Sequence, residues 1–465
     1  MKSADVVVIG GGPGGYVCGI RATQLGLKTV LVERDRLGGE CLNYGCIPSK
    51  SLITVSKLFE KVRNGAKYGL KVDAVSIDFV ALQKWKSEVV SKLVSGVGAL
   101  LSGNGVEVLK GDAELVDKNN VKVVTTAGIE QIHTKSIVIA TGTRPVSIPG
   151  LTIDREMIIT SKEALDLDRA PERFLIVGGG AIGLEFASMY QKFGSLVTVV
   201  ELTDQLLPGT DIDSVRVVQR SLENHGVKIL LKSKVASTEK STAQVKATIE
   251  TPSGTTSIEA DKILVSVGRK ANTEKLNLSA IGVELDQRGY IKVDEHMMTN
   301  VAGIYAIGDV RGPPLLAHKA SKEGIVAAES IAGKPTAADW KVIPDAIFTD
   351  PEIASAGLTE SKAIEAGYSV KRSRFPFAAL GRALSVGETE GFVKIISNAQ
   401  DGLVLGVQIV GPEASNLISE IALAIEMGAT VEDIALTVHP HPTFPEAIME
   451  AAESAAGHPV HQLKS

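Results

Sequence analysis

The same order of residues occurs twice along the chain, and this repeat constrains the fold more than any other feature. The segments "ADVVVIGGGPGGYVCGIRATQLGLKTVLVER" (4–34) and "RFLIVGGGAIGLEFASMYQKFGSLVTVVEL" (173–202) share it. Each begins with a β-branched apolar run, passes a glycine cluster, continues with helical spacing and ends in a second β-rich run. This order predicts a βαβ unit written twice, and therefore an α/β fold.

Both glycine clusters match the dinucleotide-binding pattern G-x-G-x-x-G. The matching residues are Gly10, Gly12 and Gly15, and then Gly178, Gly180 and Gly183. The first glycine allows a tight turn, the second allows backbone to approach a diphosphate, and the third allows close packing of helix on strand. A single match can be a glycine-rich turn without a ligand. Two matches in complete βαβ context predict two Rossmann-like domains, one for FAD and one for a nicotinamide nucleotide.

An acidic residue follows each cluster at the position where it can accept hydrogen bonds from ribose. Glu33 and Glu201 each lie 21 residues after the middle glycine, from 12 to 33 and from 180 to 201. A carboxylate at Glu201 repels a 2′-phosphate, and the next six residues, "LTDQLL", contain no Arg or Lys to offset that repulsion. The second site is therefore predicted to bind NAD rather than NADP.

The remaining regions divide the chain further. The charged stretch "DLDRAPER" reads as a linker before the second unit, and strand and turn signals return in 271–340. After 341 the patterns predict an α+β module with a strand pair, "GFVKIISN" and "GLVLGVQIV", and a helix over "NLISEIALAIEMG". We therefore expect a first domain at 1–150, a nucleotide domain at 151–270, a return to the first domain at 271–340 and a separate domain at 341–465.

Composition argues against several classes of protein. The net charge of −5 gives no basis for a nucleic-acid-binding surface, and no apolar run reaches the length of a membrane span. The N-terminal apolar run is too short for a signal peptide. We therefore expect a cytoplasmic protein. In a reducing compartment a structural disulfide is unfavourable, so a close cysteine pair indicates catalysis or metal binding.

Two of the three cysteines, Cys41 and Cys46, lie together in "GGECLNYGCIPSK" (38–50). A metal clip needs more ligands, and residues 30–60 contain no other Cys and no His, so we expect no metal. Lys50 follows Cys46 by four residues, and both a helix N-terminus and a nearby cation favour a thiolate. The pattern favours a redox pair beside a flavin over chance and burial, whereas Cys18 is predicted to be a core residue.

Longer motifs extend over nearly the whole chain. They are "GGECLNYGCIPSK", "ATGTRP" (140–145), "SVGRKANT" (266–273), "YAIGDV" (305–310), "LLAHKA" (315–320) and "HPHPTFPEA" (439–447). In this order they resemble the pyridine nucleotide–disulfide oxidoreductases. Among these the chain is most similar to the members that oxidise protein-bound dihydrolipoamide to lipoamide with NAD⁺. The resemblance implies two Rossmann-like domains and a C-terminal dimerisation domain.

The resemblance also implies roles for single residues. Cys46 is the thiolate that faces the flavin, Cys41 exchanges with substrate, and Lys50 lies near the reactive flavin nitrogen and pairs with Glu185. His441 is the base, oriented by Glu446, and completes the active site of the opposite subunit, so a homodimer is implied. His439 is treated as structural. The other implied cofactor-binding residues are Gly111, Thr141, Gly142, Thr143, Asp309, Leu315, Leu316, Ala317, His318 and Gly268.

Rival functions and one departure from the family pattern stay open. The implied partners are lipoyl domains of 2-oxo acid dehydrogenase or glycine cleavage complexes. Glutathione reductase is disfavoured by Glu201, mercuric reductase by the lack of cysteines after Cys46, and a non-catalytic FAD- and NAD-binding sensor by the intact redox set. Glu40 stands where threonine is common, and we hypothesise that its charge makes the Cys41 thiolate less favourable.

Overall fold

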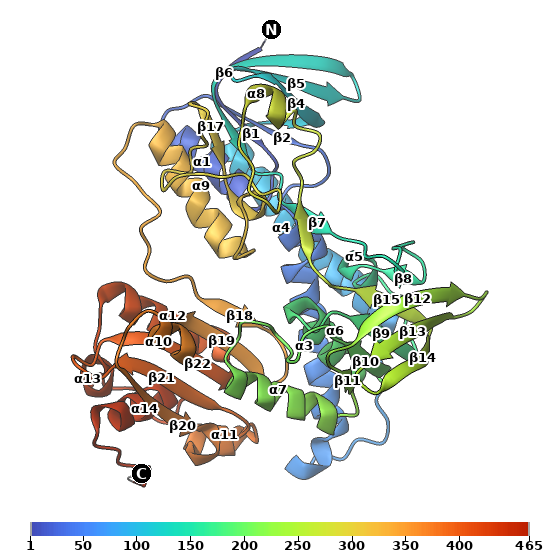
Figure 1. Cartoon of the computed structure of the whole chain (residues 1–465), viewed down its shortest axis with the longest axis vertical. Helices are drawn as coiled ribbons and strands as arrows, with labels where there is room; N and C mark the ends of the chain where they lie inside the picture. Colours follow the sequence, from blue (N-terminus) through green and yellow to red (C-terminus); the bar gives the residue numbers. More distant parts are fainter. Residues whose placement is uncertain (1, 464–465) are drawn as a thin grey trace.

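The computed structural model describes residues 2–463 and has three regions. In Figure 1 the first region, in blue, cyan and yellow, lies at the top, and the second, in green, lies at the lower right. The third, in orange and red, lies at the lower left and follows a long connection from α9 (Ala317–Ile331) to β18 (Asp345–Ile347). The expected α/β fold with two Rossmann-like units and a C-terminal α+β domain is confirmed.

The first region is built on a seven-stranded sheet of order β3-β2-β1-β6-β5-β4, with β17 paired to β6. Its strands are β1 (Lys2–Ile9), β2 (Thr29–Glu33), β3 (Glu107–Lys110), β4 (Asp112–Asp117), β5 (Asn120–Thr125), β6 (Gly128–Ile139) and β17 (Ile304–Ala306). Val6 and Val8 pack into one core, whereas Val7 and Ile9 pack into another on the opposite face. This explains the continuous apolar run of β1, since a parallel strand covered on both faces buries every side chain.

The second region repeats this arrangement. Its parallel sheet has the order β11-β10-β9-β15-β8, and a three-stranded antiparallel sheet, β12-β13-β14, lies beside it. The strands are β8 (Ile158–Ile159), β9 (Arg173–Val177), β10 (Leu196–Val200), β11 (Lys228–Leu230), β12 (Lys234–Lys240), β13 (Val245–Thr251), β14 (Gly254–Ala260) and β15 (Lys262–Val265). Two short antiparallel strands, β7 (Thr143–Pro145) and β16 (Arg269–Ala271), connect the two regions. Both predicted βαβ units are therefore present.

The third region is an antiparallel sheet of order β18-β19-β22-β21-β20 covered by helices. The further strands are β19 (Glu352–Gly357), β20 (Val370–Pro376), β21 (Phe392–Asn398) and β22 (Val404–Gly411). The helices are α10 (Glu360–Glu365), α11 (Gly381–Val386), α12 (Ala414–Met427), α13 (Val431–Leu436) and α14 (Glu446–Ala456). Strands β21 and β22 form the expected antiparallel pair, and every residue in both is buried.

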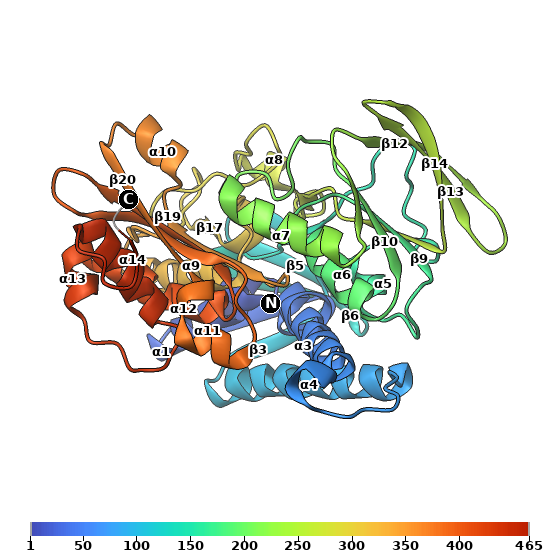
Figure 2. The ribbon, with the colours of Figure 1, turned by 90° about the horizontal axis from the view of Figure 1, so that it is seen from below.

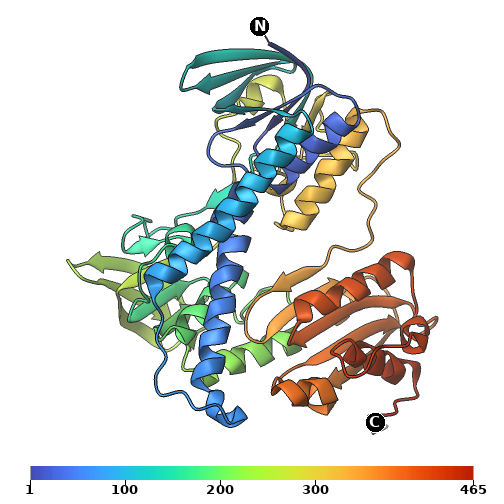
Figure 3. The ribbon, with the colours of Figure 1, turned by 180° about the vertical axis from the view of Figure 1, so that it is seen from behind.

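Helices from the first region extend onto the second. The N-terminal half of the chain contributes α1 (Pro13–Gln24), α2 (Gly39–Tyr44), α3 (Cys46–Arg63), α4 (Phe79–Gly103), α5 (Ser161–Ala164), α6 (Ala181–Lys192) and α7 (Ile212–Asn224), and α8 spans Leu278–Ile281. Figure 3 shows α4 running from the first region down to the second, and Figure 2 shows α3 beside it. Leu52 and Ile53 of α3 share a core with Phe186 and Tyr190 of α6. Within residues 2–463, no helix combines the length and apolarity of a membrane span.

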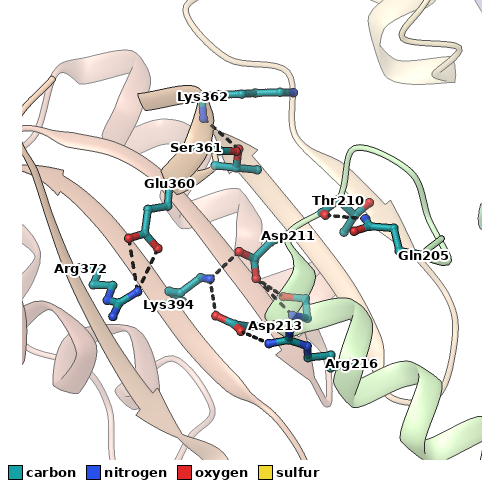
Figure 4. A network of polar contacts seen from close by, with 12 residues as sticks. Gln205, Thr210, Asp211, Asp213, Arg216, Glu360, Ser361, Lys362, Arg372 and Lys394 are labelled. Carbon is teal, nitrogen blue, oxygen red and sulfur yellow. Dashed lines mark hydrogen bonds and ion pairs between the residues drawn. The ribbon is translucent and has the colours of Figure 1, made fainter. Parts of the chain in front are cut away.

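A buried ion cluster joins the third region to the second (Figure 4). Lys394 of β21 is 3% exposed and pairs with Asp211 and, at 2.9 Å, with Asp213. Asp211 also caps α7 by accepting a hydrogen bond from the Ser214 backbone N–H at 3.1 Å. Because a buried charge is costly unless it is paired, this cluster fixes the contact between the two regions.

Two strand pairings bear on where the first domain is interrupted and resumed. Strand β17 returns to the first sheet, and β16 pairs with β7 at the junction of the first two regions. We propose 1–150 and 271–340 as the two parts of the first domain, 151–270 as the second domain and 341–465 as the third.

Candidate active site

The first glycine turn is shaped to receive a diphosphate. Gly10 has a φ of +107°, and a Cβ there would lie 2.3 Å from the Ala140 carbonyl oxygen. A Cβ on Gly15 would lie 1.8 Å from the Gly10 carbonyl oxygen. No side chain caps the N-terminus of α1, so its backbone N–H groups and helix dipole favour an anion. Glu33 accepts from the Gly11 N–H at 2.6 Å, which holds its carboxylate beside the turn. These features fit FAD.

The second turn has nearly the same geometry. Gly178 has a φ of +109°, and a Cβ on Gly183 would lie 2.0 Å from the Gly178 carbonyl oxygen. Glu201 accepts from the Gly179 N–H at 2.6 Å and from the Thr203 N–H at 2.8 Å. The N-terminus of α6 also lacks a side-chain cap. The turn therefore fits a second dinucleotide, and the contact of Glu201 with ribose stays a prediction.

The two cysteines lie on consecutive helices and form an asymmetric pair. Cys41 is half-buried on α2, and Cys46 is exposed and begins α3; both are free thiols here. A hydrogen bond with Cys41, assisted by the charge of Lys50, holds the pKa of Cys46 below that of an ordinary thiol. The same hydrogen bond, together with burial, raises the pKa of Cys41. These directions make Cys46 the more acidic thiol of the pair, and its role as the reactive thiolate stays a prediction.

Lys50 pairs with Glu185, as expected, and also contacts Phe348, which the sequence did not indicate. Its Nζ lies 3.0 and 2.9 Å from the two carboxylate oxygens of Glu185 on α6. The ammonium also lies 4.5 Å from the ring centroid of Phe348, whose backbone N–H donates to Glu185 at 2.9 Å. No short motif identified Phe348, because it reaches this site only through the packing of the third domain.

His441 and Glu446 are paired as the resemblance implied. His441 Nδ1 lies 2.8 Å from a carboxylate oxygen of Glu446, and the other oxygen accepts from the Thr443 N–H at 2.7 Å. The His441 side chain is 77% exposed, so its Nε2 is available to a substrate or a second subunit. In contrast, the imidazole of His439 is buried between Glu420 and the Thr437 carbonyl, and the Glu420 hydrogen bond raises its pKa.

Glu40 is neutralised by an ion pair rather than directed at Cys41. Its carboxylate pairs with Arg269, a residue that sequence analysis did not select. Arg269 also donates to the Thr143 hydroxyl at 2.7 Å, and Thr143 donates to Asp309 at 3.3 Å. Burial raises the pKa of Glu40. The hydrogen bond with Cys46 is the largest cause of the raised pKa of Cys41. The Glu40 carboxylate is therefore paired with a cation, whereas our hypothesis considered only its repulsion of the Cys41 thiolate.

The other expected cofactor residues lie in loops and at the ends of helices and strands. Gly142 and Gly268 both have positive φ, and the Thr141 hydroxyl donates to the Asn272 carbonyl at 2.8 Å. Leu315, Leu316, Ala317 and His318 lead into α9, and His318 contacts the Pro344 carbonyl. Strand packing alone requires glycine at position 111, because a Cβ on Gly111 would lie 2.5 Å from the Val124 carbonyl oxygen. Their contacts with cofactors stay predictions.

A buried ionic cluster that the sequence did not reveal shapes the Asp309 turn. Glu323 is fully buried and accepts from the Gly308 N–H at 2.6 Å. Arg311 and Lys319 neutralise it at 3.0 and 3.4 Å. Burial raises the pKa of Glu323 and lowers that of Lys319. In the described part of the chain, no group of three His, Cys, Asp or Glu side chains is arranged to hold a metal ion.

Two family models match the chain. The pyridine nucleotide-disulphide oxidoreductase model matches residues 4–324, and the dimerisation domain of the same family matches residues 343–452. The protein belongs to the pyridine nucleotide–disulfide oxidoreductase family. It is an oxidoreductase that uses FAD and NAD, and the C-terminal match supports a homodimer.

Several similar proteins are dihydrolipoyl dehydrogenases. The chain is 45% identical to the one from Geobacillus stearothermophilus over 457 residues, covering 98% of this chain and 97% of that protein. It is 47% identical to the one from Haloferax volcanii over 464 residues, covering 99% and 98%. Among solved structures, LpdA from Mycobacterium tuberculosis has a TM-score of 0.90 at 29% identity, covering 98% of this chain and 99% of that chain.

Proposed function

We propose that the protein oxidises dihydrolipoamide to lipoamide and reduces NAD⁺ to NADH, using the Cys41–Cys46 pair and the His441–Glu446 pair. The asymmetry of the two thiols supports this proposal most directly, since it separates an exchanging sulfur from a stabilised thiolate. Identity near 45% to dihydrolipoyl dehydrogenases over nearly the whole chain supports the substrate.

The sulfur chemistry follows from the arrangement of these groups. In the oxidised pair, a substrate thiolate attacks Cys41 Sγ, the Cys41–Cys46 bond breaks, and Cys46 leaves as a thiolate. The second substrate thiol then attacks the mixed disulfide, which releases lipoamide and returns Cys41 as a thiol. Lys50 stabilises the Cys46 thiolate throughout. FAD held at the first glycine turn would supply the chemistry that couples oxidation of the dithiol to reduction of NAD⁺.

His441 serves as the base that collects the substrate thiol proton. Glu446 fixes the ring by accepting from Nδ1–H and stabilises the imidazolium that forms. Within residues 2–463 of one chain, no hydrogen bond joins His441 to either cysteine. We infer that each site combines the cysteines of one subunit with the His441–Glu446 pair of the other. The exposed apolar side chains Leu423, Met427, Leu436 and Val438 of the third domain support an interface there.

The physiological substrate class follows from the same chemistry. A lipoyl group on a flexible protein arm can reach an exposed cysteine pair, so the proposed partners are lipoyl domains of 2-oxo acid dehydrogenase or glycine cleavage complexes. Turnover with dihydrolipoamide against reduced glutathione, and with NAD⁺ against NADP⁺, tests this assignment. Preference for glutathione or NADP⁺ would contradict it, and a protein that binds both cofactors without turnover would be a sensor.

The shared site has a direct genetic test. Co-expression of Cys41→Ser and His441→Gln chains yields heterodimers that carry one substitution in each subunit. If the site spans two subunits, one of the two sites keeps both Cys41 and His441; if it lies within one subunit, neither site does. Such heterodimers should regain about half of the wild-type activity, whereas His441→Gln homodimers should lose on the order of 10²–10⁴-fold. His461→Gln is the matched control, because His461 is another exposed histidine paired with a glutamate, Glu450 at 2.6 Å. Inactive heterodimers would contradict the shared site.

A further inference from the structure

The Lys50–Glu185 pair has a third member that comes from the third domain. Phe348 directly follows β18, and its backbone N–H donates to Glu185 Oε1 at 2.9 Å. Its ring lies under the Lys50 ammonium, 4.5 Å from Nζ to the ring centroid. One residue therefore contacts both the anion and the cation of the pair, the first through its backbone and the second through its π face.

The segment around Phe348 is held in place independently of Lys50. Ile347 is buried in the core shared by α3 and α6. Asp350 accepts a hydrogen bond at its backbone carbonyl from the Ser221 hydroxyl at 2.9 Å, and its carboxylate pairs with Lys192 at 3.0 Å. Because both sides of Phe348 are anchored to the second domain, the ring position is set by domain packing and not by Lys50.

The charges that face Cys46 make this position matter. Cys41 on α2 donates to the sulfur, Lys50 on α3 favours its thiolate, and Glu185 on α6 opposes the thiolate. The net effect of the Lys50–Glu185 pair depends on where each charge is held relative to Cys46. The Phe348 N–H donates a hydrogen bond to the Glu185 carboxylate, and the Phe348 ring offers its π face to the Lys50 ammonium.

We propose that Phe348 is a positioning residue of the redox centre, which holds Lys50 and Glu185 so that the cation favours the Cys46 thiolate. This role rests on the proposed function, in which Cys46 is the reactive thiolate. It also makes the reactivity of a first-domain sulfur depend on correct packing of the third domain.

The test measures alkylation of Cys46 in the reduced holoenzyme as a function of pH, with peptide mapping to assign the label. Phe348→Leu and Phe348→Met keep an apolar side chain and the backbone N–H but remove the ring. Either variant should slow labelling by about two- to five-fold below the thiol midpoint and move that midpoint to higher pH. Phe348→Tyr keeps the ring and should restore the wild-type profile. Two ring-deleting variants keep the test usable if one of them folds poorly.

Phe79→Leu is the matched control, because Phe79 packs against the same core but its ring faces Phe193 at 5.5 Å. It should lose thermal stability without changing the labelling profile. Equal labelling in wild type and Phe348→Leu, or equal slowing in Phe79→Leu, would overturn the role of Phe348 alone. A wild-type Cys46 that labels as slowly as an ordinary thiol would overturn the proposed function as well.

Discussion

The two glycine turns begin with nearly the same backbone angle, a φ of +107° at Gly10 and +109° at Gly178, yet they differ in what lies beside their middle glycine. In both, the chain after the acidic residue returns across the turn: the Leu207 N–H donates to the Gly179 carbonyl at 2.9 Å, and the Gly38 N–H donates to the Gly11 carbonyl at 2.8 Å. In the first turn, the chain also passes close to the middle glycine. It then enters α2, so that a Cβ on Gly39 would lie 2.6 Å from Gly12 Cα. In the second, no atom lies within 4 Å of a Cβ placed on Gly180. The first turn is therefore covered at its middle glycine, whereas the second is open there.

The helices that follow the turns differ in the same way. Helix α1 packs against α9 at backbone contact, since a Cβ on Gly324 would lie 2.5 Å from the Gly14 carbonyl oxygen. Helix α6 instead presents Glu185 to Lys50 and its apolar side chains to α3. We infer that the first turn retains FAD and that the second exchanges NAD with solvent. The same local sequence thus supports a fixed and a mobile cofactor, depending on the surrounding chain.

Replacing the third glycine of each turn should give the largest effect and separate the two cofactors. Gly15→Ala places a Cβ 1.8 Å from the Gly10 oxygen, and this variant should purify without FAD. Gly183→Ala places a Cβ 2.0 Å from the Gly178 oxygen; it should keep FAD and its reduction by dithiol but reduce NAD⁺ about 100-fold more slowly. Flavin absorbance and the two half-reactions measure this. The control is Gly96→Ala in α4, where the Cβ meets no atom within 4 Å. Loss of FAD from Gly183→Ala would break the comparison.

The two glutamates should give a smaller contrast. Glu201→Gln removes the charge that accepts from ribose, and a charged hydrogen bond of about 1.5 kcal/mol corresponds to roughly tenfold weaker NADH binding. Glu33→Gln should leave full FAD occupancy, because α2 and α9 also pack closely against the first turn. Fluorescence titration of NADH and the flavin content of each purified variant test the contrast. Equal losses at both sites would argue that this packing does not retain FAD.

Gly180→Ala should weaken NAD binding without affecting the fold. The added Cβ meets no protein atom, so the melting temperature should not change. A bound diphosphate approaches this backbone closely, and the dissociation constant for NADH should rise about five-fold. Calorimetric melting and NADH titration give the two readouts. A lower melting temperature with unchanged binding would show that the site is structural.

The pH dependence of thiol labelling should give the smallest effect. It tests the difference in acidity between Cys41 and Cys46, which follow the first turn. The lowered pKa of Cys46 predicts a larger deprotonated fraction than in an ordinary thiol with a pKa of about 8.5, so Cys46 should label a few-fold faster near pH 7. Cys41, whose pKa is raised, should label only at higher pH. Cys18 is the internal control, since burial raises its pKa to about 12. Faster labelling of Cys41 than of Cys46 would reverse the proposed roles.

Much of the site could be predicted because its determinants are local. A β-branched run, a glycine turn and an amphipathic helix specify a βαβ unit within about 30 residues, so both turns and the acids that follow them were expected correctly. The helical spacing that places Lys50 on the face of Cys46 is likewise a property of α3 alone. His441 and Glu446 are five residues apart, and their pairing depends on a single short segment.

The sequence alone determined the two nucleotide turns, the cysteine pair and the histidine–glutamate pair. Only the tertiary structure decided which charges neutralise one another. Arg269 lies 229 positions from the Glu40 it pairs with, and Phe348 lies 163 positions from Glu185. A pattern of apolar and polar residues indicates which face of an element is buried, but not which distant side chain it meets there. Burial then sets the strength of each contact, as in the fully buried Glu323 that shapes the Asp309 turn.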